Sequence, residues 1–142
     1  MIVSRHEYAA MRLEDFALFD DWEDRYKFII ELGSGLEPLS DEEHNEVNKV
    51  PGCVSQVWLI SEGSSDKIQF RGDSDAHIVK GLVAILLSIF SGKSAHEIME
   101  INAQAIFEKL GLKDHLTPQR SNGFYAMVSR IRADAEALVA GK

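Results

Sequence analysis

A pair of strand-like stretches followed directly by a long apolar segment constrains the fold more than any other feature of the chain. Residues 54–62 and 67–73 have the character of strands, and the Gly-Ser-Ser-Asp sequence between them has the length and chemistry of a hairpin loop. In the second stretch Ile68 and Phe70 alternate with polar residues, which predicts one buried face. Residues 57–60 are apolar on both faces, which indicates a central strand.

Segments with helical periodicity flank this hairpin on both sides. Asp20 or Asp21 is the expected N-cap of the second helix, and Ser74 or Asp75 that of the long apolar helix after the hairpin. Ser94 and Asn102 are the expected N-caps of the two short helices that follow. Gly33 and Gly35 are expected to end the second helix. The predicted helices cover residues 8–19, 22–32, 76–91, 94–100, 103–110 and, from 119 or 121, a last helix to 138. The periodicity of the last helix predicts an inner stripe of Phe124, Met127, Val128, Ile131, Ala135 and Leu138.

The order of these elements indicates an α+β fold, with a small antiparallel three-stranded sheet packed against several helices. The third strand is a very short one expected at residues 49–50. No repeat, low-complexity segment or linker divides the chain, and 142 residues is a usual domain size. We therefore expect a single domain over residues 1–142.

Charge and cysteine content exclude several classes of function. The net charge is −8 and no Lys/Arg cluster is present, which argues against binding to nucleic acid or to anionic membranes. The most apolar stretch, residues 78–90, is shorter than the ~20 residues that a membrane span needs. The N-terminus shows no secretory signal, and one cysteine cannot form an internal disulfide. These features predict a cytoplasmic protein.

The single cysteine, Cys53, follows a Pro-Gly turn and precedes a strand. On position alone, a small buried hydrophobe is the better hypothesis for such a residue. The chain has no Cys-x-x-Cys, no ligand set for a metal or cluster, and no phosphate-binding loop. His44 is the histidine nearest in sequence, without a spacing diagnostic of a nucleophile–base pair. A solitary thiol of this kind suits a carrier, since the donor enzyme supplies the activation.

The sequence resembles the SufE-type sulfur acceptors of iron–sulfur cluster assembly. The similarity spans about residues 13–138, and its motifs occur in the family's order. These motifs are Gly-Cys-Val-Ser-Gln-Val-Trp at 52–58, Gly-Asp-Ser-Asp-Ala at 72–76, Phe-Glu-Lys-Leu-Gly-Leu at 107–112 and His-Leu-Thr-Pro-Gln-Arg-Ser-Asn-Gly at 115–123.

The resemblance implies a fold similar to SufE and NifU proteins, with the cysteine at a loop tip beside the sheet. Cys53 is then the persulfide acceptor that takes sulfur from a SufS-type cysteine desulfurase, stimulates it, and supplies iron–sulfur scaffold proteins. Pyridoxal phosphate belongs to that partner, so neither cofactor nor metal is expected on this chain. Asp75 and Arg120 match positions associated with docking the desulfurase. Gln56 is a further candidate for a polar contact near the thiol.

Two other functions are compatible with the residues alone. The chain could be a non-transferring adaptor that regulates a desulfurase, with Cys53 purely structural. It could also be a cysteine hydrolase, although its scattered histidines give that little support. For a carrier, we expect the Cys53 thiol to be shielded by its loop and apolar neighbours, because an exposed persulfide is readily lost.

Overall fold

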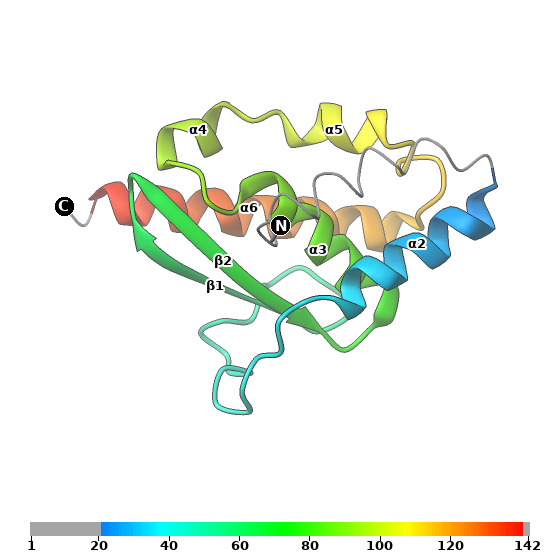
Figure 1. Cartoon of the computed structure of the whole chain (residues 1–142), viewed down its shortest axis with the longest axis horizontal. Helices are drawn as coiled ribbons and strands as arrows, with labels where there is room; N and C mark the ends of the chain where they lie inside the picture. Colours follow the sequence, from blue (N-terminus) through cyan, green and yellow to red (C-terminus); the bar gives the residue numbers. More distant parts are fainter. Residues whose placement is uncertain (1–20, 141–142) are drawn as a thin grey trace, which may run out of the picture.

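The structure, a computed structural model, describes residues 21–140, so the helix predicted at 8–19 lies outside the described residues. The expected order of elements is confirmed: one helix, a β-hairpin, then four helices (Figure 1). The elements are α2 (Trp22–Ser34), β1 (Val57–Ser64), β2 (Lys67–Ser74), α3 (His77–Phe90), α4 (Ala95–Glu100), α5 (Ala103–Lys109) and α6 (Pro118–Ala140).

The sheet is a single antiparallel hairpin of β1 and β2, joined by the two-residue loop 65–66. It has two strands within the described residues, so the prediction of a third strand at 49–50 was wrong. That segment forms only an isolated bridge, between Lys49 and Trp58. Pro51 follows directly; it has no backbone N–H to donate, and the chain turns away at this point.

Strand β1 buries one face and not both, contrary to the sequence prediction. Val57 and Leu59 are fully buried, whereas Trp58 and Ile60 are partly exposed. The loop before β1 covers the outer face, with the ring of His44 edge-on to Trp58 at a centroid separation of 4.6 Å. The strand also begins three residues later than predicted, which leaves residues 53–56 in an irregular loop.

Helices α2 and α3 pack at a very short separation that two glycines permit. A Cβ atom on Gly81 would lie 2.2 Å from the carbonyl oxygen of Ile29. One on Gly33 would lie 2.6 Å from the backbone nitrogen of Gly81. Of the two glycines expected to end α2, Gly35 is its C-cap, as predicted. Gly33 lies inside the helix, which continues to Ser34, and is a buried contact point between the two helices.

Helix α6 runs the length of the molecule and contacts α3, α4 and β1 (Figure 1). Its ring of Phe124 also meets Phe107 of α5, with centroids 4.6 Å apart. The predicted inner stripe is confirmed for all but its last member, which is partly buried. The buried residues of α6 are Gly123, Phe124, Met127, Val128, Ile131 and Ala135.

Side chains cap three of the helices at the predicted residues, which are Asp21, Ser94 and Asn102. The prediction for α3 was wrong. Its N-cap is Ala76, which makes no side-chain cap bond, because the carboxylate of Asp75 is used elsewhere.

Candidate functional site

Cys53 lies in a loop whose base is closed by a backbone hydrogen bond. The N–H of Val50 donates to the carbonyl of Val57 at 2.8 Å, so residues 51–56 project as a closed excursion between the bridge and β1. Gly52 has φ +87°, and Pro51 precedes it, as in a type II turn. The left-handed backbone conformation at Gly52 requires glycine and sets the direction in which the next residue leaves the turn.

The Cys53 thiol is half-buried against the first turns of α6. Its Sγ donates to the carbonyl oxygen of Gly123 at 3.7 Å. Burial raises the pKa of Cys53, so the resting thiol is protonated at neutral pH. His44 is not positioned as its base, because both imidazole nitrogens bond to Ser40 and Asp73.

A cavity of about 240 Å³ adjoins the thiol. It is large enough for several water-sized groups. Val54, on its wall, is an apolar side chain that is 77% exposed. Its lining residues are Cys53, Val54, Ser55, Val79, Thr117, Gln119, Arg120, Gly123 and Met127.

The N-terminal ends of two helices contribute to this cavity. Val79 belongs to the first turn of α3, and Gln119 and Arg120 to the first turn of α6. The hydroxyl of Thr117 accepts one of the free N–H groups of α6, that of Arg120, at 3.2 Å. Helix N-termini favour negative charge, and the exposed Arg120 guanidinium adds a full positive charge. Positive charge therefore lies on this side of the cavity.

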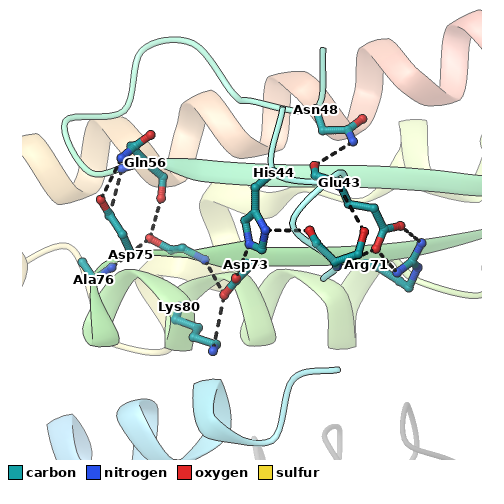
Figure 2. Close-up of polar contacts among 11 residues, drawn as sticks. Glu43, His44, Asn48, Gln56, Arg71, Asp73, Asp75, Ala76 and Lys80 are labelled. Carbon is teal, nitrogen blue, oxygen red and sulfur yellow. Dashed lines mark hydrogen bonds and ion pairs between the residues drawn. The ribbon is translucent and has the colours of Figure 1, made fainter. Parts of the chain in front are cut away.

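Asp75 and Gln56 bind one another and connect the Cys53 loop to the β2–α3 turn (Figure 2). One carboxylate oxygen of Asp75 accepts the backbone N–H of Gln56 at 3.0 Å, and the other accepts its side-chain amide at 3.3 Å. The Asp75 N–H returns a bond to the Gln56 carbonyl at 3.2 Å, and the Ser74 hydroxyl donates to the same carbonyl at 2.8 Å. Four hydrogen bonds at Gln56 thus fix the C-terminal end of the Cys53 loop to the turn between β2 and α3.

The predicted site residues therefore form two groups that share one loop. Cys53 and Arg120 line the same cavity. Gln56 and Asp75 make the hydrogen-bonded pair at the end of the loop, and both side chains remain exposed on the surface.

An ion-pair network holds the segment before Cys53 to the hairpin (Figure 2). Arg71 of β2 pairs with Glu43 and with Glu62, the latter at 2.6 Å. Ser40 and Glu43 exchange the two hydrogen bonds of a capping box. The hydrogen bond from Arg71 is the largest influence that lowers the pKa of Glu43 from 4.5 to about 2.

His44 makes the second connection in the same network (Figure 2). Its Nε2 lies 2.7 Å from Asp73 Oδ2, and its Nδ1 lies 2.7 Å from the carbonyl oxygen of Ser40. Both partners are acceptors only, so the doubly protonated ring satisfies both. The hydrogen bond to Asp73 raises the pKa of His44, and Lys80 approaches the other oxygen of Asp73 at 3.3 Å.

Beyond Val54 and Ser55, which follow Cys53 in its loop, sequence reasoning missed five further residues of the cavity wall. Three of them lie in the Thr-Pro-Gln-Arg-Ser-Asn-Gly motif, in which only Arg120 had been assigned a role. The other two have the periodicity of core residues, which does not distinguish a cavity wall from a filled interior. The five are Val79, Thr117, Gln119, Gly123 and Met127.

Two searches of the described residues were negative. Within residues 21–140, no cluster of three or more His, Cys, Asp or Glu side chains is arranged to hold a metal ion. In the same part of the chain, no helix has both the length and the apolar character needed to cross a membrane.

Comparison with known proteins gives concordant matches. Residues 10–135 match the family model described as SufE, Fe-S metabolism associated domain. An uncharacterised SufE-like protein of Rhizobium etli is 52% identical over 128 residues, covering 87% of this chain and 86% of the relative. A similar protein of Rhizobium meliloti is 51% identical over 128 residues, covering 87% and 91%. The solution structure of a hypothetical protein from Thermus thermophilus has a TM-score of 0.74, with 99% of both chains covered at 20% identity, and so shares the fold.

Proposed function

Because this chain belongs to the SufE family of proteins associated with Fe-S metabolism, we propose that Cys53 accepts sulfur from a cysteine desulfurase and carries it as a persulfide. The donor is a SufS-type enzyme, which holds the pyridoxal phosphate and is stimulated when its sulfur is removed. Iron–sulfur scaffold proteins receive the sulfur. The cytoplasm is the compartment we propose for this exchange, since it keeps a lone thiol reduced.

The transfer is a thiol–disulfide type of exchange. The Cys53 thiolate attacks the outer sulfur of the persulfide on the desulfurase cysteine. A new S–S bond forms on Cys53, the S–S bond of the donor breaks, and the desulfurase cysteine leaves as a thiolate. One sulfur atom is transferred from the desulfurase cysteine to Cys53, and no net oxidation occurs. The proton lost from the Cys53 thiol passes to solvent or to a base of the partner.

The observation that carries this proposal is the position of Cys53 beside the cavity. Its thiol is half-buried, and the adjoining 240 Å³ has room for one further sulfur atom. A persulfide is more acidic than its parent thiol, so it is carried as an anion. The first turns of α3 and α6 and the Arg120 charge would stabilise that anion, whereas burial keeps the unloaded thiol protonated. The site would therefore favour the loaded form over a reactive free thiolate.

The desulfurase docks, in this proposal, on the surface around the Cys53 loop. Arg120 supplies a cation beside Cys53, Val54 an exposed apolar contact, and the Asp75–Gln56 pair a polar group at the loop end. A partner that engages these side chains reaches the thiol without unfolding any helix or strand.

The test is sulfur loading in the presence of an active desulfurase and cysteine, followed by intact mass under non-reducing conditions. The wild-type chain is expected to gain one sulfur atom, and Cys53→Ser none, with an unchanged melting temperature. Arg120→Ala is expected to need more desulfurase for half-maximal loading, whereas Glu136→Ala, on an exposed site of α6, is not.

Two results would contradict the carrier function. One is an active desulfurase that leaves the wild-type mass unchanged. The other is full stimulation of the desulfurase by Cys53→Ser, which would indicate a non-transferring adaptor with a structural cysteine.

A further inference from the structure

The segment that leads into Cys53 presents backbone carbonyls in two opposite directions. On one side, the Asn48 carbonyl accepts the N–H of Leu59 and the Val50 N–H donates to Val57, both at 2.8 Å. Successive residues of an extended chain direct their backbone groups to alternate sides. The Lys49 carbonyl consequently points away from β1, where the described sheet has no further strand. The Val47 carbonyl belongs to the turn that precedes the bridge.

The guanidinium of Arg130 on α6 binds both of these carbonyls. One terminal nitrogen donates to the Val47 oxygen at 2.9 Å, and the other donates to the Lys49 oxygen at 3.2 Å. The Nε of Arg130 donates to Asp134, one turn further along α6, at 3.0 Å. The Arg130 and Asp134 side chains are only 20% and 18% exposed. This planar fork takes the place of the missing neighbouring strand.

The remainder of the segment follows the same face of α6 towards the thiol. Its three contact points on the helix are Arg130, Ala126 and Gly123, spaced by four and three residues. A Cβ on Gly52 would lie 3.4 Å from that of Ala126, and the Cys53 sulfur lies against Gly123. Residues at this spacing share one helix face.

We propose that Arg130 is a positioning residue for Cys53. It fixes the start of the loop to α6 and thereby keeps the thiol in its half-buried place beside the cavity, although it does not touch the sulfur. The role in shielding a persulfide rests on the proposed function, whereas the role in placing the thiol does not.

Arg132 provides a matched control on the same helix. It too donates to a backbone carbonyl, that of Ile101 at 2.8 Å, but this residue lies between α4 and α5. Arg130→Gln and Arg132→Gln each remove a partly buried guanidinium that braces α6. Only the first releases the segment before Cys53. An effect that both variants share reports a general loss of stability. An effect seen only in Arg130→Gln reports a change at the Cys53 thiol.

The experiment is the rate of labelling by a maleimide-linked polyethylene glycol, which reports on Cys53 alone because the chain has one cysteine. We expect Arg130→Gln to react roughly tenfold faster than the wild type, since a charge-assisted hydrogen bond is lost. Its apparent thiol pKa from the pH profile of labelling should fall, because burial is what raises it. Arg130→Lys keeps the positive charge but not the two terminal nitrogens of the guanidinium. Its labelling rate is expected to lie between those of the wild type and Arg130→Gln. Arg132→Gln should match the wild type.

Equal labelling rates and pH profiles for the Arg130 variants and Arg132→Gln would overturn the inference. If Arg130→Gln does not fold, the comparison is made with Arg130→Lys. The half-life of a desulfurase-loaded persulfide towards glutathione is then measured, and a shorter half-life in the Arg130 variant is expected. Faster labelling with no persulfide on the wild type would retain the positioning role and reject sulfur transfer.

Discussion

At the scale of single residues, the site is a thiol whose surroundings were not visible as a motif. Cys53 was identified from its turn and its family resemblance. Its burial, its contact with Gly123 and its raised pKa arise because α6, some 70 residues later, passes beneath the loop. Gln56 and Asp75 were assigned as independent contacts, but they satisfy one another. Both residues lie at the open end of the hairpin, next to the Val57–Ser74 pair, so their pairing depends on the strand register.

Replacing His44 by glutamine should give a pH-dependent loss of stability. The pKa of His44 is raised in the folded protein, so its charge stabilises the fold fully below the ordinary value of 6.5. That stabilisation is lost as pH rises through the folded value. The deficit of His44→Gln relative to wild type should be about 1 kcal/mol, or roughly 3–5 °C in melting temperature, at pH 6. It should shrink as pH increases towards 9.

The control is His96→Gln. His96 is 83% exposed and pairs with Glu100 within α4, so its replacement should change the melting temperature only slightly. A deficit of His44→Gln that grows with pH would show that the ring is neutral in the folded protein.

At the scale of elements, local signals located the helices and the hairpin well. Caps at Asp21, Ser94 and Asn102 were predicted because capping depends on residues within one turn of each other. Errors arose where a residue packs against a segment that is distant in the sequence. Gly33 was assigned as a helix stop, yet it lies within α2 because α3 packs against it.

Adding one methyl group at Gly81 should separate α2 from α3. The Cβ would lie 2.2 Å from a backbone oxygen of α2, which cannot rotate away, so the helices must shift. Overpacking of this kind costs about 1–3 kcal/mol, or roughly 3–10 °C in melting temperature. Thermal unfolding followed by circular dichroism measures the change.

Gly35→Ala is the matched control for this substitution. Gly35 has φ −85°, and a Cβ there would lie at an ordinary 3.5 Å from the Leu32 carbonyl. Its melting temperature should stay close to that of the wild type. An equally stable Gly81→Ala would mean that α2 and α3 tolerate a wider separation.

At the scale of the whole molecule, stability should be greatest in mildly acidic solution. The pKa values of Glu43 and Glu97 are lowered from 4.5 by hydrogen bonds from Arg71 and Ser94 respectively, so their contribution exists above pH 4.5 and is lost as pH falls. The pKa of Asp73 is also lowered: burial raises it, but hydrogen bonds from His44, Ser74 and Lys80 together lower it by more. Asp73 therefore stabilises the fold in the same pH direction as the two glutamates. His44 contributes in the opposite sense, below pH 6.5.

The melting temperature should therefore reach a maximum between about pH 5 and 6.5 and decline on both sides. A pH series of thermal unfolding in buffers of equal ionic strength measures it. Glu43→Gln should reduce the decline of melting temperature on the acid side of the maximum and leave the alkaline side unchanged. A maximum above pH 8 would contradict these assignments.

Cys53 was proposed as the sulfur acceptor from the resemblance of the sequence to a family. The sequence by itself also determined the α+β class and the order and approximate bounds of the described elements. These follow from periodicity, turn residues and caps, all of which act over a few positions along the chain. Only the tertiary structure decided that the sheet has two strands and that the edge at 47–49 is completed by Arg130. It also decided that the N-termini of α3 and α6 meet beside Cys53. Such contacts join residues 26 to 83 positions apart, and their energy depends on distances in space that no local pattern encodes.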